Sequence, residues 1–81
     1  MTTGDKVLAI LREHGGELST DELARRIWPD CPSWIYPTRR SHTYGACAML
    51  EKYGILARRV ETHRHAYANH VAYWRIQEAE A

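Results

Sequence analysis

Hydrophobic residues in the first part of the chain recur at i, i+3, i+4 and i+7, the spacing of one helix face. The residues on this face are Val7, Ile10, Leu11 and His14. Because Gly15-Gly16 interrupts the pattern, we predict a helix over about residues 4–14 that buries this face, His14 included. Leu18 follows as an isolated hydrophobic residue, which we expect to form a short strand at the edge of a sheet.

Polar residues predict the start of a second helix, and a proline predicts its end. Ser19 offers a side-chain oxygen and Glu22 a carboxylate three residues later, which together form a capping box. Pro29 cannot donate the next helical hydrogen bond, so we place this helix over residues 20–28. In this register the hydrophobic side chains point inward and the Arg25-Arg26 pair points outward.

A third, longer helix is predicted after a connector at residues 30–36. Pro37 suits the first helical position, and the helical spacing continues to residue 53 through Thr43, Cys47 and Leu50. Gly54 stands where a left-handed residue commonly ends a helix. The connector contains Trp34, Ile35 and Tyr36, and we therefore expect it to pack on the body of the protein.

After Gly54 the hydrophobic period changes from 3.6 to 2, which predicts strands at residues 56–62 and 71–76. Polar residues at 62–69 join them as a hairpin, which is too small to be stable alone and must lean on the helices. The aromatic residues assigned to the core or its rim are Trp28, Trp34, Tyr53 and Trp74. The predicted fold is therefore α+β, with a three-helix core and a C-terminal two-stranded β-hairpin.

The composition is that of a small folded domain. With 81 residues, 44% hydrophobic and 26% charged, we expect one domain over residues 1–81, frayed at residues 1–3 and 77–81. The two cysteines, the absence of a recognisable signal peptide and the lack of a long apolar run point away from a disulfide scaffold and a membrane protein. We expect a cytoplasmic location, with association to the nucleoid if the chain binds DNA.

Charge is distributed unevenly along the chain. Residues 36–76 carry seven Lys and Arg against two Glu, a net charge of +5, whereas residues 1–35 carry four basic against six acidic side chains, a net charge of −2. Such an asymmetry favours an anionic partner on one side of the molecule.

The corner between the third helix and the first hairpin strand reads ACAMLEKYGIL over residues 46–56. With the order helix, short strand, helix, helix, hairpin, this corner resembles the end of the recognition helix in a winged helix-turn-helix DNA-binding domain. The similarity covers about residues 5–76, with a connector longer than the family's turn and Cys47 in place of the usual aliphatic residue. The resemblance implies that the third helix enters the major groove and that the hairpin touches the adjacent backbone or minor groove.

The candidate DNA contacts lie at the start of the third helix and along the hairpin. Arginine can pair bidentately with guanine edges or phosphate oxygens, and the first turns of a recognition helix usually make the base contacts. The candidates are Arg39, Arg40, Ser41, His42, Tyr44, Arg58, Arg59, His63, Arg64 and His65. Because Arg58 and Arg59 lie on opposite strand faces, we expect one to clamp the backbone and the other to be solvated or at the core rim.

Metal binding and catalysis find little support. The potential metal ligands form no Cys-x-x-Cys or His-x-x-x-His pair; they are Cys31, Cys47, His63, His65 and His70. There is no phosphate-cradling glycine-rich loop, and we expect neither an enzyme nor a cofactor.

Two function classes remain. The first is sequence-directed binding of double-stranded DNA by a small transcriptional regulator or by a viral or mobile-element protein. The second is a winged helix used as a protein-interaction module within a larger assembly, because a fold does not fix its function. A homodimer is an open alternative in the first class.

Overall fold

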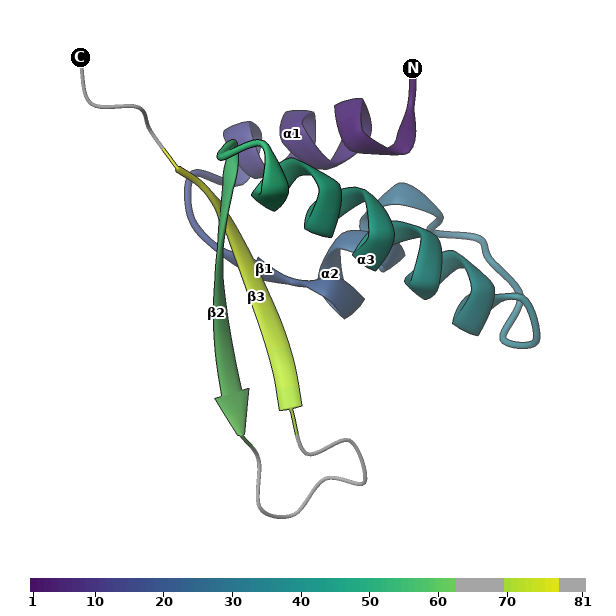
Figure 1. Ribbon diagram of the computed structural model, residues 1–81. Helices are drawn as coiled ribbons and strands as arrows, with labels where there is room; N and C mark the ends of the chain where they lie inside the picture. Colours follow the sequence, from purple (N-terminus) through teal and green to yellow (C-terminus); the bar gives the residue numbers. More distant parts are fainter. Residues whose placement is uncertain (63–69, 78–81) are drawn as a thin grey trace.

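The computed structural model describes residues 1–62 and 70–77, which form three helices and a three-stranded antiparallel sheet. In chain order the elements are α1 (Thr3–His14), β1 (Leu18–Ser19), α2 (Thr20–Ile27), α3 (Tyr36–Lys52), β2 (Leu56–Thr62) and β3 (His70–Ile76) (Figure 1). The α+β class predicted from the sequence is confirmed. In the part of the chain that the structure describes, no helix is long and apolar enough to cross a membrane.

The first two helices both begin with a capping box. The amide of Glu22 donates to the Ser19 side chain at 3.1 Å, and the Ser19 amide donates to the Glu22 carboxylate at 3.0 Å, as the sequence predicted. Thr2 and Asp5 form the same reciprocal pair at the start of α1. Thr2 and Thr3, which we expected to be frayed, therefore belong to the cap and first turn of α1. Each box satisfies two amides that a helix start would otherwise leave unpaired.

The predicted end of α3 at Gly54 is confirmed. Gly54 has a φ of 79°, and its amide donates to the Glu51 carbonyl at 2.9 Å. The Ile55 amide donates to the Leu50 carbonyl at the same distance, which completes a Schellman motif. A side chain at position 54 would be strained at this φ, so glycine permits the chain to leave the helix and enter β2 at once.

The sheet has one strand more than the predicted hairpin. Its order is β1-β3-β2, with Leu18 opposite Trp74 on one side and Arg58 opposite Trp74 on the other. The expectation that Leu18 pairs as an edge is confirmed, whereas the description of the sheet as two-stranded is corrected to three. The β2–β3 hairpin lies against the helices at the end where β2 begins and extends beyond them at its other end (Figure 1).

The core lies where the three helices meet the base of the sheet. Its buried hydrophobic residues are Val7, Leu11, Leu18, Leu23, Ala24, Cys47, Leu56 and Trp74. Trp74 is the largest of them and is fully buried. Leu50 continues the helical spacing of Thr43 and Cys47, which are buried, but it is only partly buried itself and packs at the edge of this cluster.

Three residues assigned to the interior are exposed. Trp34 and Tyr53 are 79% and 70% exposed, and His14 is also exposed, so these predictions were wrong. The helical period gives the direction of a side chain such as His14 but not whether another element covers it. The connector packs through Ile35 and Tyr36, which are half-buried, while Trp34 points away from the body.

Candidate nucleic-acid interface

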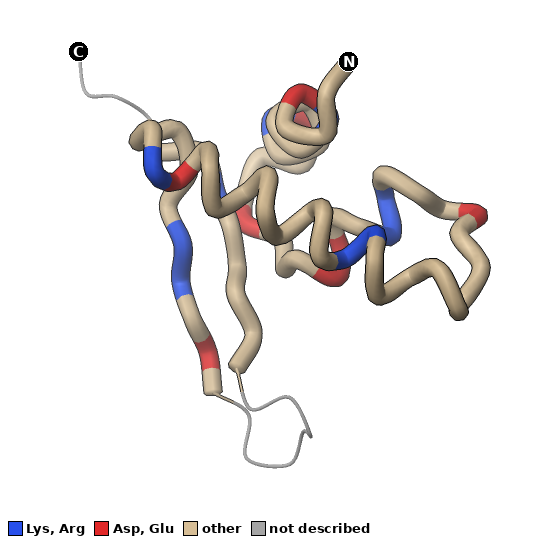
Figure 2. Tube along the Cα trace, turned by 45° about the vertical axis from the view of Figure 1, so that its right-hand side comes forward, with Lys and Arg blue, Asp and Glu red and all other residues tan. Residues whose placement is uncertain are grey.

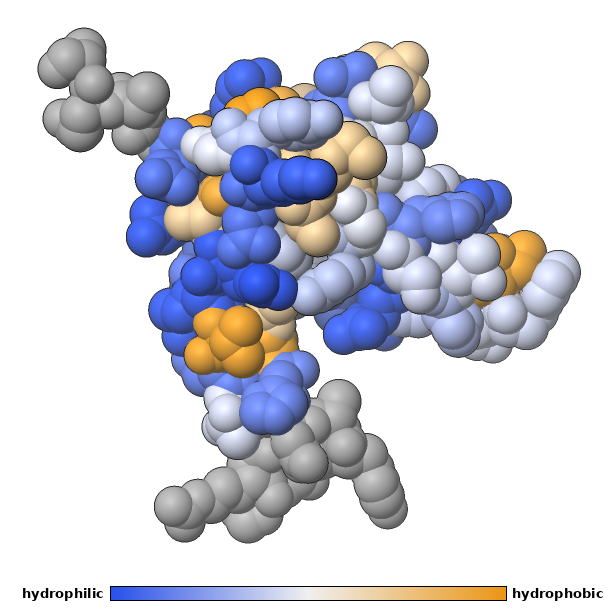
Figure 3. Space-filling model, in the orientation of Figure 1, coloured by the Kyte–Doolittle hydropathy of each residue, from blue (hydrophilic) through white to orange (hydrophobic). Residues whose placement is uncertain are grey.

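A shallow hollow of about 250 Å³ lies between the start of α2, the middle of α3 and the hairpin. We call it the helix–hairpin hollow; its lining residues are Thr20, Arg40, Tyr44, Arg58, Val60, His70 and Ala72. Figure 3 shows a hydrophobic patch low on the hairpin bordered by hydrophilic side chains, and Val60 on β2 is 53% exposed. Two guanidinium groups, a phenol and an imidazole thus line a concave surface that is open to solvent.

Arg58 is held in the hollow by three contacts, and the aromatic side chains it touches also contact each other. Its Nη1 donates to the Tyr44 hydroxyl at 2.7 Å, and its Nε lies 3.3 Å from the Glu51 carboxylate. Its guanidinium also sits over the Trp74 ring, 5.7 Å from the centroid. The Tyr44 ring meets the same indole edge to face, with centroids 5.6 Å apart and an interplanar angle of 75°. The side chain of Arg58 is therefore oriented before any ligand arrives, which lowers the entropy cost of binding.

Arg40 enters the hollow from α3 and lies beside a carboxylate of α2. Its Nε is 3.9 Å from Asp21 Oδ1, which also accepts a hydrogen bond from the Tyr36 hydroxyl. Asp21 Oδ2 accepts from Arg25 Nε at 3.0 Å. Partial burial raises the pKa of Asp21, but the hydrogen bonds from Tyr36 and Arg25 outweigh this and leave it below its ordinary value. The carboxylate is thus ionised at neutral pH and links α2 to the start of α3.

Arg59 lies on the opposite strand face, where carboxylates of the protein itself bind its guanidinium. Its Nε donates to Glu17 at 3.1 Å, its Nη1 donates to Glu61 at 2.6 Å, and its guanidinium lies over the Tyr73 ring, 4.5 Å from the centroid. Its Nη2 also donates to Glu17, and these hydrogen bonds raise the pKa of the Arg59 guanidinium. The two neighbouring arginines were expected to differ. Arg58 faces the hollow, and Arg59 joins β2 to the turn before β1.

The other helix candidates face elsewhere. Arg39 is half-buried, with its guanidinium 5.1 Å from the Trp28 ring centroid, and it forms no ion pair within residues 1–62 and 70–77. Ser41 and His42 are exposed and lie on the side of α3 that faces α1. His63, Arg64 and His65 lie outside the residues that the structure describes.

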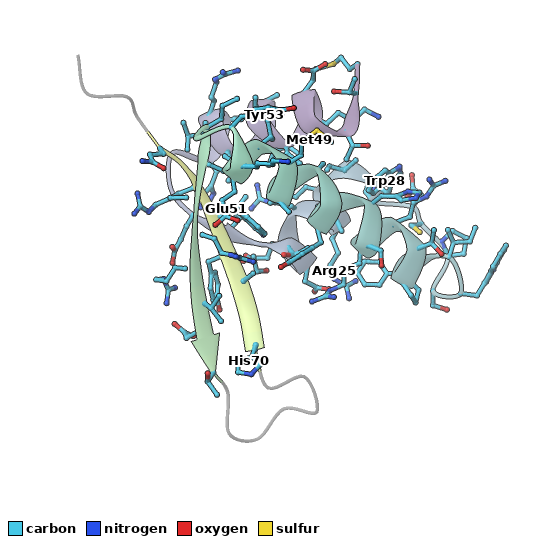
Figure 4. The ribbon with its side chains drawn as sticks, viewed as in Figure 1. Arg25, Trp28, Met49, Glu51, Tyr53 and His70 are labelled. Atoms are coloured by element: carbon cyan, nitrogen blue, oxygen red, sulfur yellow. The ribbon has the colours of Figure 1, made fainter. Side chains whose placement is uncertain are left out.

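The side of α3 near α1 forms a second concavity, the α1–α3 groove, of about 600 Å³. Its lining residues are Thr2, Thr3, Gly4, Asp5, Leu8, Ser41, His42, Gly45, Ala46, Met49 and Leu50. Met49 is 58% exposed there. Figure 4 shows Met49 and Tyr53 on this side of α3, with Arg25 on the other side. The first turns of α3 therefore present Arg40 to the hollow and Ser41 and His42 to the groove.

The charge separation seen along the chain is partly cancelled in space. Figure 2 shows acidic positions of α2 close to the basic start of α3, and a basic stretch along β2. Asp21 and Glu17, from the acidic first half, pair with Arg40 and Arg59 of the basic second half. The surface near the hollow is consequently less positive than the linear count indicates.

Sequence reasoning missed His70, Asp21 and Glu51 as members of the site. His70 lies opposite Thr62, with its Nδ1 3.3 Å from the threonine hydroxyl, and shares a strand face with Trp74. Extending the two-residue period by one more position would have found it. The i, i+4 spacing from Asp21 to Arg25 is also visible in the sequence, whereas the pairs Asp21–Arg40 and Glu51–Arg58 depend on the tertiary fold.

The potential metal ligands do not gather into a site among the described residues, and one of the two thiols is buried. Among the described residues, no group of three His, Cys, Asp or Glu side chains is placed to hold a metal ion. Cys47 is fully buried, and burial raises the pKa of its thiol to about 12. Comparison of the chain with protein-family models, with curated proteins and with solved structures gives no match.

Proposed function

We propose that the chain is a winged helix-turn-helix domain that binds double-stranded DNA in a sequence-directed way. The first turns of α3 would enter the major groove, and the β2–β3 hairpin would serve as the wing against the adjacent backbone. The order of the elements and the short β1 strand paired beside the hairpin support this proposal. A small transcriptional regulator, or a viral or mobile-element DNA-binding protein, is the class of protein we infer.

One observation carries the proposal. Arg40 and Tyr44 from α3 and Arg58 and His70 from the hairpin line the same hollow, so one stretch of DNA backbone could contact both elements. Arginine is suited to phosphate because its planar fork offers several N–H donors. Both closest approaches to a carboxylate are made by Nε, from Arg40 to Asp21 and from Arg58 to Glu51, and terminal amino groups remain for a ligand.

Base reading is assigned to the start of α3. Ser41 and His42 are exposed there, and Arg39 has no competing carboxylate in the described part of the chain. These side chains offer hydrogen bonds to base edges, while Arg40 and Arg58 supply attraction that depends on salt but not on sequence.

The test compares two double variants, Arg39→Ala/Arg40→Ala in α3 and Lys6→Ala/Arg12→Ala in α1. Each removes two positive charges, and both side chains of the α1 variant are exposed. Selection from random duplexes first defines a preferred site, and anisotropy titrations then measure affinity for it. We expect the α3 variant to lose about 1–3 kcal/mol for each arginine that contacts a base, and the α1 variant to lose much less. Equal affinities of the folded α3 variant and the wild type would remove the central claim.

The second candidate is a protein-interaction module, favoured by the apolar α1–α3 groove and by Trp34, which is 79% exposed. Retention on DNA or heparin distinguishes the two functions. DNA binding predicts retention that falls steeply as salt rises, and the interaction module predicts none that depends on salt. Light scattering with and without DNA would show whether two copies bind one palindromic site.

A further inference from the structure

Three side chains from two helices meet at Asp21, two of them as hydrogen-bond donors and Arg40 as an ion-pair partner. It lies in the first turn of α2, and its carboxylate is approached by Arg25 of the same helix and by Tyr36 and Arg40 of α3. The Tyr36 ring also lies under the Arg25 guanidinium, 4.7 Å from the centroid. A single carboxylate therefore sets the positions of two arginines on adjacent helices.

The way in which the arginines approach Asp21 leaves them able to bind a second anion. Arg25 donates through Nε at 3.0 Å, and Nε is also the closest atom of Arg40, at 3.9 Å. A guanidinium has five N–H bonds, of which Nε carries one. The Nη1 and Nη2 groups of both residues are not used by Asp21. Arg59 differs, because Glu17 and Glu61 together engage its Nε, Nη1 and Nη2.

We propose that Asp21 is a positioning residue for DNA recognition, which holds Arg25 and Arg40 with their terminal amino groups directed at one backbone phosphate. This inference rests on the proposed function; it gives Asp21 a role in the site and adds Tyr36 and Arg25 to it. Tyr36 fixes Asp21 by its hydroxyl and Arg25 by its ring. The phosphate contact then sets the depth and register at which α3 enters the major groove.

A negative charge beside a phosphate also has a cost. Asp21 repels the DNA backbone, so it must lower the attraction that is independent of sequence while it improves the fit to the preferred site. Positioning therefore predicts opposite effects on two kinds of DNA when Asp21 loses its charge. Neither a merely structural role nor simple repulsion predicts opposite effects.

The experiment compares Asp21→Asn with Asp30→Asn, since Asp30 is an exposed carboxylate without an ion pair among the described residues. Anisotropy titrations use the preferred duplex and a scrambled duplex of equal length at several salt concentrations. For Asp21→Asn we expect affinity for the preferred duplex to fall about tenfold and affinity for the scrambled duplex to rise. Asp30→Asn should slightly raise the affinity for both duplexes.

Tyr36→Phe provides a second variant without a change of charge. It keeps the ring under Arg25 and removes the hydrogen bond to Asp21, so it should lower affinity for the preferred duplex and leave the scrambled one unchanged. In an Arg25→Ala/Arg40→Ala background, Asp21→Asn should cause no further loss, because Asp21 acts through those arginines.

Each contrary outcome has a distinct meaning. If Asp21→Asn weakens both duplexes equally and lowers the melting temperature, Asp21 is structural and the inference is overturned. If it strengthens both duplexes, Asp21 only repels DNA, and the inference is overturned while the proposed function stands. A wild-type chain that binds the selected and scrambled duplexes equally, or binds neither, would overturn the sequence-directed function and the role of Asp21 with it.

Discussion

The indole of Trp74 donates a 2.8 Å hydrogen bond from Nε1 to the hydroxyl of Thr20, and both side chains are buried, at 0% and 2% exposure. Thr20 is the first residue of α2 and Trp74 lies in the middle strand of the sheet. One buried hydrogen bond thus joins the helix that carries Asp21 to the strand beside Arg58. This contact fixes the start of α2 against β3, the strand that also carries His70.

Thr20→Val tests this link. Valine keeps the shape of threonine but cannot accept a hydrogen bond, so the buried indole N–H would lose its partner. We expect the free energy of unfolding to fall by about 1–3 kcal/mol, because an unsatisfied buried donor keeps its full desolvation cost. Urea denaturation measures the change. Serine at the same position retains the acceptor and is the matched control; an equally stable valine variant would show that the hydrogen bond contributes little.

Leu56 and Leu50 form a matched pair for testing the core. Leu56 is 1% exposed, whereas Leu50 is only partly buried at the edge of the cluster. Leu56→Ala should therefore cost about 2–5 kcal/mol, the range for a fully buried leucine, and Leu50→Ala should cost less. Thermal and urea unfolding of both variants check this order. A larger loss at Leu50 would mean that α3 presents a different face to the core.

The two cysteines should differ in reactivity. Cys47 is fully buried and its pKa is raised to about 12, so its thiol stays neutral and shielded, while Cys31 in the connector is half-buried. We expect iodoacetamide at neutral pH to modify the native chain at Cys31 and to reach Cys47 only after unfolding. Mass spectrometry of digested protein identifies the modified site. Rapid modification of Cys47 in the native chain would contradict the position of α3.

Local rules predicted the elements well because the relevant information is local. The capping box at Ser19 and the helix end at Gly54 depend on residues within three or four positions. The alternation in β2 gave its bounds, residues 56–62, and placed Arg58 and Arg59 on opposite faces. These predictions needed no knowledge of the tertiary fold.

The partners of charged and aromatic side chains could not be predicted in the same way. Glu17 and Arg59 are separated by 42 positions, and no local period reveals that they form an ion pair. Trp34 and Tyr53 are of residue types that are often buried, but the exposure of each depends on whether another element covers it. The candidate site was therefore predicted as a set of basic and polar residues. The carboxylates that pair with Arg40, Arg58 and Arg59 were not part of the prediction.

Acid should destabilise the protein through three carboxylates. The pKa of Asp5 is lowered by its hydrogen bonds from Thr2, that of Glu17 by the hydrogen bond from Arg59, and that of Asp21 by Tyr36 and Arg25, despite the opposing effect of burial. Their ordinary values are 3.8, 4.5 and 3.8. A pKa that is lower in the folded state stabilises the fold above the ordinary value, and the stabilisation is lost as the pH falls through the folded value.

We therefore expect the free energy of unfolding to be steady near neutral pH and to decrease as the pH falls below about 4.5. Urea denaturation at a series of pH values measures the slope. Asp21→Asn should show a shallower decrease than the wild type. A stability that rises on acidification would mean that these carboxylates are not paired as described.

Arg58→Ala and Arg59→Ala remove the same charge from adjacent positions, yet they should differ in their effect on DNA binding. Arg58 faces the helix–hairpin hollow with a terminal amino group to spare, whereas Glu17 and Glu61 engage Arg59 from several sides. We expect Arg58→Ala to weaken binding to all duplexes and to reduce the salt slope by about one. Arg59→Ala should stay closer to the wild type, provided that affinities are compared near physiological ionic strength, where charges beyond about 8 Å are largely screened. Equal losses would show that DNA responds to net charge rather than to the hollow, and would move the predicted contact away from this side of the hairpin.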